Sequence, residues 1–483
     1  MKQEAQNRQF TLNSKIIKNF PFAVVNKSAS TTTLLNFLEL PSDCKSWLCQ
    51  KFTDKKTGRL NAFLLSEYVK KMRLKPEEFN MKMLEARHSS DGQIKFLSKV
   101  RIEFDYDKDI IKFFLDEYQL PKKTSTTVEW HVISKYKSYF LNPNGVWGEI
   151  TIQYNCSQLE MIDFVPLCPY SYDLKIFREK REYFTLEEWI DVLLGGLGFN
   201  SDAYDKEGKI ALLERFLPLV ESRLNMIEAS IKGSGKSYCY SQVSKYSWLT
   251  AGSLSRATAF YNNTTKKTGY FFSNDTVTFD EIQTMAVNKP EEMAGMLKTY
   301  LESGEVRIGN FVGNADAGLT LVGNVNINKT DFEKQNVLSG LPKMWNESAI
   351  IDRFSLIIDG VKIGRFSENK RATGFNLSAE YLTGMFHELR SEFYYRAIID
   401  EMLIAEEDCD VRNFEQIKRV ATALLKLLFP HVTSVDDIDV KEFKEWVLEP
   451  AIKGRYLVLC QLRFIDGKEY NNIKMPKIKI KNA

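Results

Sequence analysis

The chain is poor in the residues that build disulfide frameworks and zinc centres. Its 483 residues include only 7 cysteines and 4 histidines. The cysteines are odd in number, widely spread and without a Cys-x-x-Cys pair, a pattern that predicts reduced thiols in a cytosolic protein. They are Cys44, Cys49, Cys156, Cys168, Cys239, Cys409 and Cys460. The histidines are scattered as well, so the sequence offers no zinc hydrolase site.

The sequence also lacks long apolar runs and an excess of charge of one sign. The amino terminus is polar, and no window approaches the roughly 18 apolar residues of a membrane helix. We therefore expect neither export nor membrane insertion, and a cytoplasmic location. Lysine and arginine number 66 against 63 acidic residues, for a net charge of +3. Any affinity for nucleic acid must then come from charges clustered on one face or in a channel.

The most informative segment that is present reads Lys-Gly-Ser-Gly-Lys-Ser, at 232–237, after the apolar run at 224–227. Strand, glycine turn, Lys-Ser and then helix is how proteins hold nucleotide phosphates. Backbone N–H groups close around the phosphate oxygens, Lys236 reaches the β and γ phosphates, and the hydroxyl of Ser237 binds Mg²⁺. The residues that we expect to hold ATP are Gly233, Ser234, Gly235, Lys236 and Ser237.

One glycine of this phosphate-loop pattern is missing. The pattern has a glycine, four residues, and then Gly-Lys-Ser or Gly-Lys-Thr, and the first glycine position holds Ser230. A serine strains the loop if this position requires a positive φ angle. Taken alone, the segment can also be a surface turn that contains a lysine.

A second motif follows about 45 residues later. The short run at 276–279 is rich in β-branched and aromatic residues and ends in Asp280 and Glu281, which is the Walker B form. We expect Asp280 to hold Mg²⁺ through water, and Glu281 to orient or deprotonate the water that attacks the γ phosphate. The alternative is a strand end with solvated acids. The order and spacing of the two motifs favour a P-loop NTPase.

Two further segments complete the pattern. Residues 319–324 form another short apolar run that closes on Asn324, whose amide we expect to hold the attacking water or touch the γ phosphate. By itself this segment is only a turn signal. Residues 350–354 place Arg353 where ring ATPases carry an arginine finger for the neighbouring subunit's nucleotide. The alternative is that Arg353 pairs with Asp352 or a nearby acid.

The order of these motifs resembles the BrxL family, the Lon-protease-like ATPases of BREX phage-defence systems, in a shorter form without a protease domain. The resemblance spans most of the chain. It is carried by Phe184–Asp191, Leu224–Glu228, Thr278–Ile282, Tyr300–Gly304, Leu321–Asn324, Ile351–Phe354 and, upstream, Asn144–Gly148. The family usually shows Gly-Pro before the final glycines of its phosphate loop, where this chain has Ser230 and Ile231. That departure bears on the rate of nucleotide turnover.

The resemblance implies more than the spacing does. It implies an AAA+ P-loop core similar to that of MCM helicases, a homo-oligomeric ring of one hexamer or stacked hexamers, and double-stranded DNA in the channel. Other BREX proteins are implied as partners. In such rings a hairpin before the third motif presents basic side chains to DNA, and the matching stretch is 302–310 with Arg307 as the phosphate contact. The alternative is a weak surface pair of Arg307 with Glu305 or Glu302.

Breaks in composition divide the chain into segments, and roughly 100 to 200 residues per domain predicts two to four domains. We expect an α+β amino-terminal domain at 1–160 and a linker at 161–183. An α/β ATPase core with a parallel sheet follows at 184–370, then a helical lid at 371–455 and a basic tail at 456–483. The core opens with a capping box, after which the glycines at 195–196 end the first helix.

Three smaller predictions concern basic residues outside the core motifs. In the lid, Arg390 is the candidate for a sensor arginine, with a plain surface arginine as the alternative. In the tail, the alternating 477–481 segment predicts an edge strand that lysines protect. The amino-terminal domain is a candidate for DNA binding, although a lysine face over an aromatic core is favoured. The residues concerned are Lys122, Lys123, Lys135, Lys137, Trp130, Tyr136 and Tyr139.

Three functions remain open. The first is an ATPase ring in phage defence, in which hydrolysis drives movement along, or remodelling of, duplex DNA. The second is an ATP-dependent unfoldase that works with a separate protease chain, since no segment after the lid is long enough for a Ser/Lys dyad before Ala483. The third is a nucleotide-binding scaffold with little turnover, which Ser230 motivates.

Overall fold

The computed structural model divides the chain into two compact units. It describes residues 2–27, 40, 42–54, 60–89, 92–105, 110–120, 124–140, 145–155, 158–167, 170–324, 331–406 and 409–481. One unit comprises Met1–Lys27 with Tyr172–Ala483, and the other comprises Ser28–Ser171. These borders differ from the predicted domains, because the first 27 residues group with the carboxyl-terminal part of the chain. Strand β1 (Val24–Asn26) pairs there with β18 (Phe375–Leu377).

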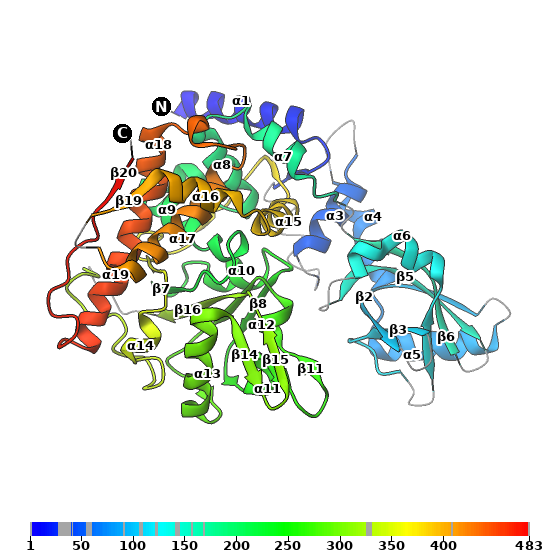
Figure 1. The fold of residues 1–483 in the computed structure, drawn as a ribbon. Helices are drawn as coiled ribbons and strands as arrows, with labels where there is room; N and C mark the ends of the chain where they lie inside the picture. Colours follow the sequence, from blue (N-terminus) through cyan, green and yellow to red (C-terminus); the bar gives the residue numbers. More distant parts are fainter. Residues whose placement is uncertain are drawn as a thin grey trace. The chain divides into compact units, whose positions relative to one another are not determined.

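The smaller unit is built on a five-stranded sheet of order β3-β2-β5-β6-β4 (Figure 1). Strand β4 runs parallel to β6, and the other pairs are antiparallel. A core cluster that includes Phe79, Phe96 and Tyr118 lies between the sheet and its helices. The elements are α3 (Ser42–Phe52), α4 (Ala62–Met72), α5 (Pro76–His88), β2 (Gln93–Asp105), β3 (Ile110–Leu115), β4 (Ser125–Val128), α6 (Trp130–Phe140), β5 (Val146–Asn155) and β6 (Gln158–Pro166).

Helix α6 carries the aromatic segment of this unit that the sequence made a DNA-binding candidate. Tyr136 packs edge-on against Phe164, with ring centroids 5.5 Å apart, whereas Trp130 is 72% exposed. The aromatic residues are therefore divided between the core and the surface. Of the residues named in the sequence analysis, Lys122, Lys123, Asn144, Cys156, Cys168 and Ala483 lie outside the described residues.

The larger unit contains a parallel five-stranded sheet of order β17-β7-β16-β12-β8. Its three inner strands, β7, β16 and β12, are almost wholly buried, as expected for a parallel sheet with both faces covered, whereas the edge strand β8 is partly exposed. The predicted α/β core with its parallel sheet is thus confirmed. The sheet consists of β7 (Met226–Ser230), β8 (Ser247–Thr250), β12 (Thr276–Phe279), β16 (Gly318–Asn324) and β17 (Leu356–Asp359).

Helix α8 (Leu186–Leu197) shows why the first core helix begins as expected and ends later. The predicted capping box is present, since Thr185 and Glu188 exchange their hydrogen bonds. The helix nevertheless continues through Gly195 and Gly196 to a left-handed Gly198, so the predicted stop was wrong. A Cβ on Gly195 would lie 2.1 Å from Asn376 Oδ1, which indicates that close packing requires these glycines.

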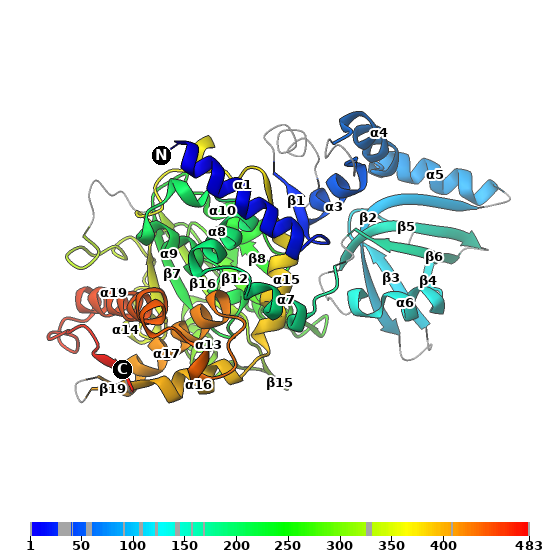
Figure 2. The same cartoon turned by 90° about the horizontal axis from the view of Figure 1, so that it is seen from above.

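Helix α1 (Lys2–Asn19) lies over α8 within the same unit, as Figure 2 shows, and Lys15 Nζ pairs with Glu188 at 2.6 Å. Shorter elements precede α8, connect it to the sheet and connect the sheet strands to one another. They are α7 (Leu174–Arg181), α9 (Lys206–Glu214), α10 (Lys236–Ser241), β9 (Ser253–Leu254), α11 (Arg256–Ala259), β10 (Tyr261–Asn262), β11 (Lys267–Thr268), α12 (Tyr270–Ser273), β13 (Ala286–Val287) and α14 (Ser348–Ile351).

A hairpin lies between β12 and β16 in the chain, where the sequence predicted one. Helix α13 (Pro290–Ser303) ends at a left-handed Gly304 and leads into β14 (Glu305–Ile308), which pairs with β15 (Phe311–Asn314). The two strands are antiparallel, with Arg307 opposite Val312.

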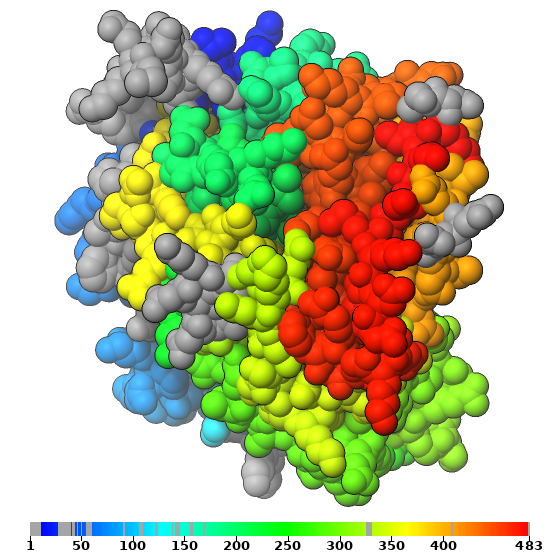
Figure 3. Space-filling model, turned by 90° about the vertical axis from the view of Figure 1, so that its left-hand side faces the viewer, coloured from blue at the N-terminus to red at the C-terminus, as the bar shows by residue number. Residues whose placement is uncertain are grey.

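The carboxyl-terminal part is helical as predicted. Its last helix, α19, contacts residues that precede α14, since Gln461 of this helix accepts a hydrogen bond from Val337 N and donates one to Phe332 O. Figure 3 shows this face of the molecule. Strand β20 (Ile478–Ile480) pairs with β19 (Leu403–Ala405). The helices are α15 (Ala379–Arg390), α16 (Tyr394–Met402), α17 (Val411–Leu428), α18 (Val440–Phe443) and α19 (Glu449–Ile465).

Within the described ranges, none of the helices is long and apolar enough to span a membrane. The five cysteines that the structure describes form no disulfide with one another. In the same part of the chain, no cluster of three or more His, Cys, Asp or Glu side chains is placed to hold a metal ion.

Candidate nucleotide site

The phosphate-loop motif and the two motifs after it converge at one edge of the parallel sheet. Strand β16 lies between β7 and β12, with Asn324 in register with Ser230, and Leu321 with Phe279. Because the three strands run in the same direction, their carboxyl ends meet at the same edge, where ligands of open α/β sheets bind.

The side chains that the sequence singled out contact one another there. Lys236 Nζ donates to Asn324 Oδ1 at 2.9 Å and to Ile231 O at 3.0 Å. Ser237 Oγ donates to Asp280 Oδ2 at 3.3 Å. Burial lowers the pKa of the Lys236 ammonium, while Glu228 and Asp280 act in the opposite direction. A lysine, a hydroxyl, a carboxylate and an amide are thus brought together from three strand ends.

The loop between β7 and α10 has the backbone of a phosphate cradle. Gly233 and Gly235 have φ angles of 78° and 80°, a conformation that glycine adopts without cost. A Cβ on Gly233 would meet nothing within 4 Å, so the space in front of the loop is open. The carbonyl of Gly233 is held by Phe366 N at 2.8 Å. Fixed glycines with open space before them suit backbone N–H groups that must approach phosphate oxygens.

Ser230, in the place of the missing glycine, is the last residue of β7 and is not among the residues with positive φ. The strain that a serine brings to a left-handed position therefore does not arise. Gly360 makes room for the side chain, because a Cβ at this position would lie 2.2 Å from Ser230 Cβ. Ser230 thus takes the place of the glycine in the motif, and Gly360, which follows β17, leaves space for its side chain.

Glu281 directly follows Asp280 and has a φ angle of 50°, which is uncommon for a residue other than glycine. The turn is held locally, since Glu281 N donates to Asp280 Oδ1 at 2.8 Å and Thr284 Oγ1 donates to Glu281 O at 3.1 Å. The exposed side chain of Glu281 leaves the strand end at this turn. Strained backbone of this kind costs about 1–3 kcal/mol and often marks functional positions.

A buried ion pair beneath the loop was not anticipated from the sequence. Arg215 and Glu228 are both fully buried and are joined by two hydrogen bonds, of 2.6 Å and 3.0 Å. Arg215 also donates to Ser234 O at 3.1 Å, and Tyr240 donates to Glu228 at 2.7 Å. Arg215 holds the pKa of the Glu228 carboxyl below its usual value despite burial. The signal in the sequence was a glutamate inside the apolar strand that precedes the loop.

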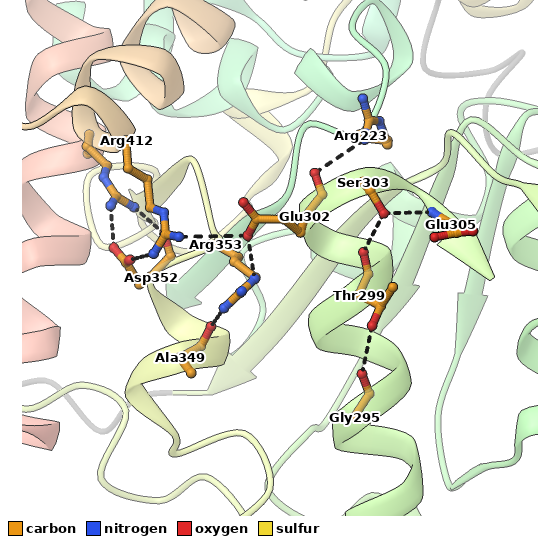
Figure 4. Close-up of polar contacts among 11 residues, drawn as sticks. Arg223, Gly295, Thr299, Glu302, Ser303, Glu305, Ala349, Asp352, Arg353 and Arg412 are labelled. Atoms are coloured by element: carbon orange, nitrogen blue, oxygen red, sulfur yellow. Dashed lines mark hydrogen bonds and ion pairs between the residues drawn. The ribbon is translucent and has the colours of Figure 1, made fainter. Parts of the chain in front are cut away.

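Among the residues that the structure describes, Arg353 is not part of the cluster that Lys236, Ser237, Asp280 and Asn324 form. Its Nε pairs with Glu302 at 2.8 Å, and its guanidinium also donates to Ala349 O (Figure 4). It lines a cleft of about 1070 Å³ together with Glu302, Asp352, Arg412 and Tyr470. In this chain Arg353 therefore forms an ion pair with a nearby acid, as the alternative interpretation allowed, and that acid is Glu302 and not Asp352.

Arg307 lies on the outer face of β14 and is 71% exposed along its side chain. Its Nη2 pairs with Glu305 at 2.5 Å, which is one of the surface pairs that the sequence allowed. An exposed pair of this kind contributes little to stability, about 0–1 kcal/mol, and exchanges readily for another anion.

Arg390 lies at the opposite end of the parallel strands from the phosphate loop. It is 5% exposed, and its guanidinium donates to the carbonyls of Pro218, Glu221 and Asp316. Asp316 immediately precedes the residues that lead into β16, so Arg390 lies at the amino ends of the parallel strands, opposite the phosphate loop. Because Arg390 is buried, it is not the plain surface arginine of the alternative interpretation, and its role as a sensor arginine stays a prediction.

Two family models match the chain. "Lon-like protease BrxL-like, ATPase domain" covers residues 159–476, and "BREX system Lon protease-like protein BrxL N-terminal" covers residues 18–154. Among curated proteins, the chain is similar to "Lon-like protease BrxL" of Bacillus cereus (strain H3081.97), at 28% identity over 397 residues. The protein of the same name from Escherichia coli O9:H4 (strain HS) is 26% identical over 395 residues.

These matches cover 80% of this chain and 57% and 55% of the two relatives, so the chain spans little more than half of their length. Among solved structures, a full-length MCM homologue from Methanopyrus kandleri aligns over 75% of this chain and 78% of its own, at 15% identity. The TM-score of this alignment is 0.39.

Replacement of Arg215 by Met is expected to destabilise the larger unit by about 3–5 kcal/mol, because Glu228 would remain buried without its partner. Urea unfolding followed by tryptophan fluorescence measures the change. The double variant Arg215→Met/Glu228→Gln, which removes the stranded charge, should lose less stability than the single variant. A single variant as stable as the wild type would show that the pair does not support the loop.

Glu214 gives a pH dependence of opposite sign to that of an ordinary carboxylate. Burial, with Asp359 and Glu228 nearby, raises its pKa to about 8. The folded state therefore keeps a proton that the unfolded chain releases near pH 4.3, so that this group lowers stability by roughly 1.4 kcal/mol per pH unit between these values. Glu214→Gln should match the wild type at pH 4.5 and unfold at higher urea at pH 7.5. Equal urea midpoints for both proteins at pH 7.5 would contradict this.

Proposed function

The chain belongs to the BrxL family, and on that premise we propose that it is an ATP-hydrolysing AAA+ ring protein. It binds double-stranded DNA, and hydrolysis drives translocation on that DNA or its remodelling in BREX defence against phage. The observation that carries the proposal is the convergence of Lys236, Ser237, Asp280 and Asn324 at three adjacent strand ends. A lysine in a surface turn and solvated acids at a strand end were the alternatives for the separate motifs. Neither alternative accounts for side chains from three strand ends that contact one another.

The groups present fit ATP with Mg²⁺. The open space before Gly233 and the positive φ angles of Gly233 and Gly235 suit a phosphate chain held by backbone N–H groups. Ser237 and Asp280, already within 3.3 Å of each other, supply the hydroxyl and carboxylate oxygens that Mg²⁺ prefers. The metal neutralises charge on the phosphate oxygens when it is bound.

Each of the remaining side chains has a separate task in this proposal. Lys236 binds the β and γ phosphates, exchanging its contacts with Ile231 O and Asn324 for phosphate oxygens. Glu281 accepts the proton of the attacking water, and Asn324 orients that water by a hydrogen bond. The charge of Lys236 is needed at neutral pH, and the acids Glu228 and Asp280 favour it.

Arg353 is proposed to act on the nucleotide of a neighbouring copy in a ring. In this chain it lies at a cleft and pairs with a half-exposed Glu302, away from its own phosphate loop. An arginine held by an exposed acid can move to a phosphate at small cost, since such pairs contribute about 0–1 kcal/mol. This arrangement supports a homo-oligomer, a hexamer or stacked hexamers, in which the seam completes the site.

The hairpin of β14 and β15 is proposed to contact the DNA backbone through Arg307, which is exposed and held only by Glu305. The name of the relatives, Lon-like protease BrxL, favours a second candidate. In that alternative the chain is an ATP-dependent unfoldase that works with a separate protease. Acceleration of hydrolysis by unfolded polypeptide, without any effect of DNA, would support the unfoldase. The scaffold function is less well supported, because Ser230 causes no backbone strain.

Lys236→Ala and Glu281→Gln should each lower the rate of ATP hydrolysis by about 100-fold or more, the contribution of a positioned acid, base or charge. Phosphate release by the purified full chain measures this, and circular dichroism checks that the variants remain folded. Lys289→Ala, at an exposed lysine before α13, serves as the control. Wild-type rates in both site variants would remove these residues from the mechanism.

Arg307→Ala should weaken the binding of duplex DNA and reduce the slope of log K against log salt by about 1 for each Arg307 that contacts a phosphate. Fluorescence anisotropy of labelled duplex at several salt concentrations measures both. Arg396→Ala, which removes a surface arginine paired with Asp400 and Glu415, is the matched control. An unchanged slope in Arg307→Ala would exclude the hairpin arginine from the DNA interface.

A further inference from the structure

Glu302 lies between the hairpin of β14 and β15, which is proposed to contact DNA, and Arg353, which is proposed to act on the nucleotide of a neighbouring copy. It is the last but one residue of α13, and its carboxylate receives Arg353 Nε at 2.8 Å and lies 3.9 Å from Arg412 Nη2 (Figure 4). Three residues further along the chain, Glu305 begins the hairpin and pairs with Arg307. One short segment therefore connects the hairpin to the arginine at the cleft.

This junction is held by backbone contacts on both sides. Gly304 N donates to Tyr300 O in the last turn of α13 at 2.7 Å, and Ala315 N, directly after β15, donates to Gly304 O, directly before β14, at 2.9 Å. Gly304 has a φ angle of 79°, and a Cβ there would lie 2.7 Å from Ala315 O. Because the packing is this tight, displacement of the hairpin moves the end of α13 with it.

On the other side of the contact, the backbone around Arg353 is fixed. Arg455 is fully buried and donates to Asp352 O at 2.9 Å, to Phe354 O at 2.7 Å and to Asp352 Oδ1 at 2.5 Å. The second carboxylate oxygen of Asp352 pairs with Arg412. With the chain held on both sides of Arg353, the direction of its guanidinium is set by two partners, the carbonyl of Ala349 and the carboxylate of Glu302, and Glu302 is the charged one.

We propose that Glu302 is a positioning residue that couples the hairpin to Arg353. Displacement of the hairpin by a bound duplex shifts the Glu302 carboxylate, which changes where Arg353 points. The contact is suited to such a role because the Glu302 side chain is half exposed, whereas Arg353 is one-fifth exposed, so that the carboxylate is the more accessible partner of the pair. The inference rests on the proposed function, and it assigns to Glu302 the link between DNA binding and hydrolysis.

The test uses Glu302→Gln in the full chain, which keeps the size of the side chain and removes its charge. Rates of ATP hydrolysis are measured with and without duplex DNA, together with KM for ATP and the affinity for DNA. The ratio of the rate with DNA to the rate without it should fall by about threefold or more, within the coupling expected for residues in contact. KM and DNA affinity should stay unchanged, since Glu302 holds neither ligand.

Glu291→Gln, in the exposed first turn of the same helix, is the control and should keep the wild-type ratio. The inference is overturned if Glu302→Gln responds to DNA as the wild type does, if both variants change alike, or if DNA does not affect the wild type. No hydrolysis by the wild type at all would reject the proposed function itself. That outcome is distinguishable from hydrolysis that DNA accelerates equally in the wild type and in Glu302→Gln.

Discussion

In strand β16, Asn324 is in register with Ser230 of β7, and Leu321, three residues earlier in β16, is in register with Phe279 of β12. This parallel alignment of three neighbouring strands is the constraint on which the candidate site depends. It brings a lysine, a hydroxyl, a carboxylate and an amide from segments almost 90 residues apart to within hydrogen-bond distance. A shift of one residue in any of these strands would turn its terminal side chain to the other face of the sheet.

The charged pairs of the larger unit fall into two kinds. The buried pair of Arg215 and Glu228 fixes the phosphate loop from below, and its rupture would leave a charge without water or partner. The pairs of Arg353 with Glu302 and of Arg307 with Glu305 each have one partner whose side chain is more than half exposed, so they are more easily exchanged than the buried pair. The buried pair thus lies at the phosphate loop, which must keep its shape. The more exposed pairs involve Arg353 and Arg307, which are proposed to contact another molecule.

The sequence predicted the parts of the fold that local chemistry determines. The glycine turn, the strand ends at Asp280 and Asn324 and the cap at Thr185 are all local patterns. Contacts between distant segments were not predictable: Gly195 and Gly196 continue a helix because Asn376 and Leu382 approach them. The contacts of Arg390 with three carbonyls at the far edge of the sheet are of the same kind. The roles of the site residues themselves remain proposals that rest on this geometry.

The central claim is that the side chains at the carboxyl ends of β7, β16 and β12 form a site that binds ATP with Mg²⁺. Isothermal titration calorimetry of the full chain with a non-hydrolysable ATP analogue tests it most directly. We expect saturable binding that requires Mg²⁺ and is lost when Asp280 is replaced by Ala in a protein that remains folded. Absence of binding by the well-folded wild type, or binding that the Asp280→Ala variant retains in full, would contradict the account.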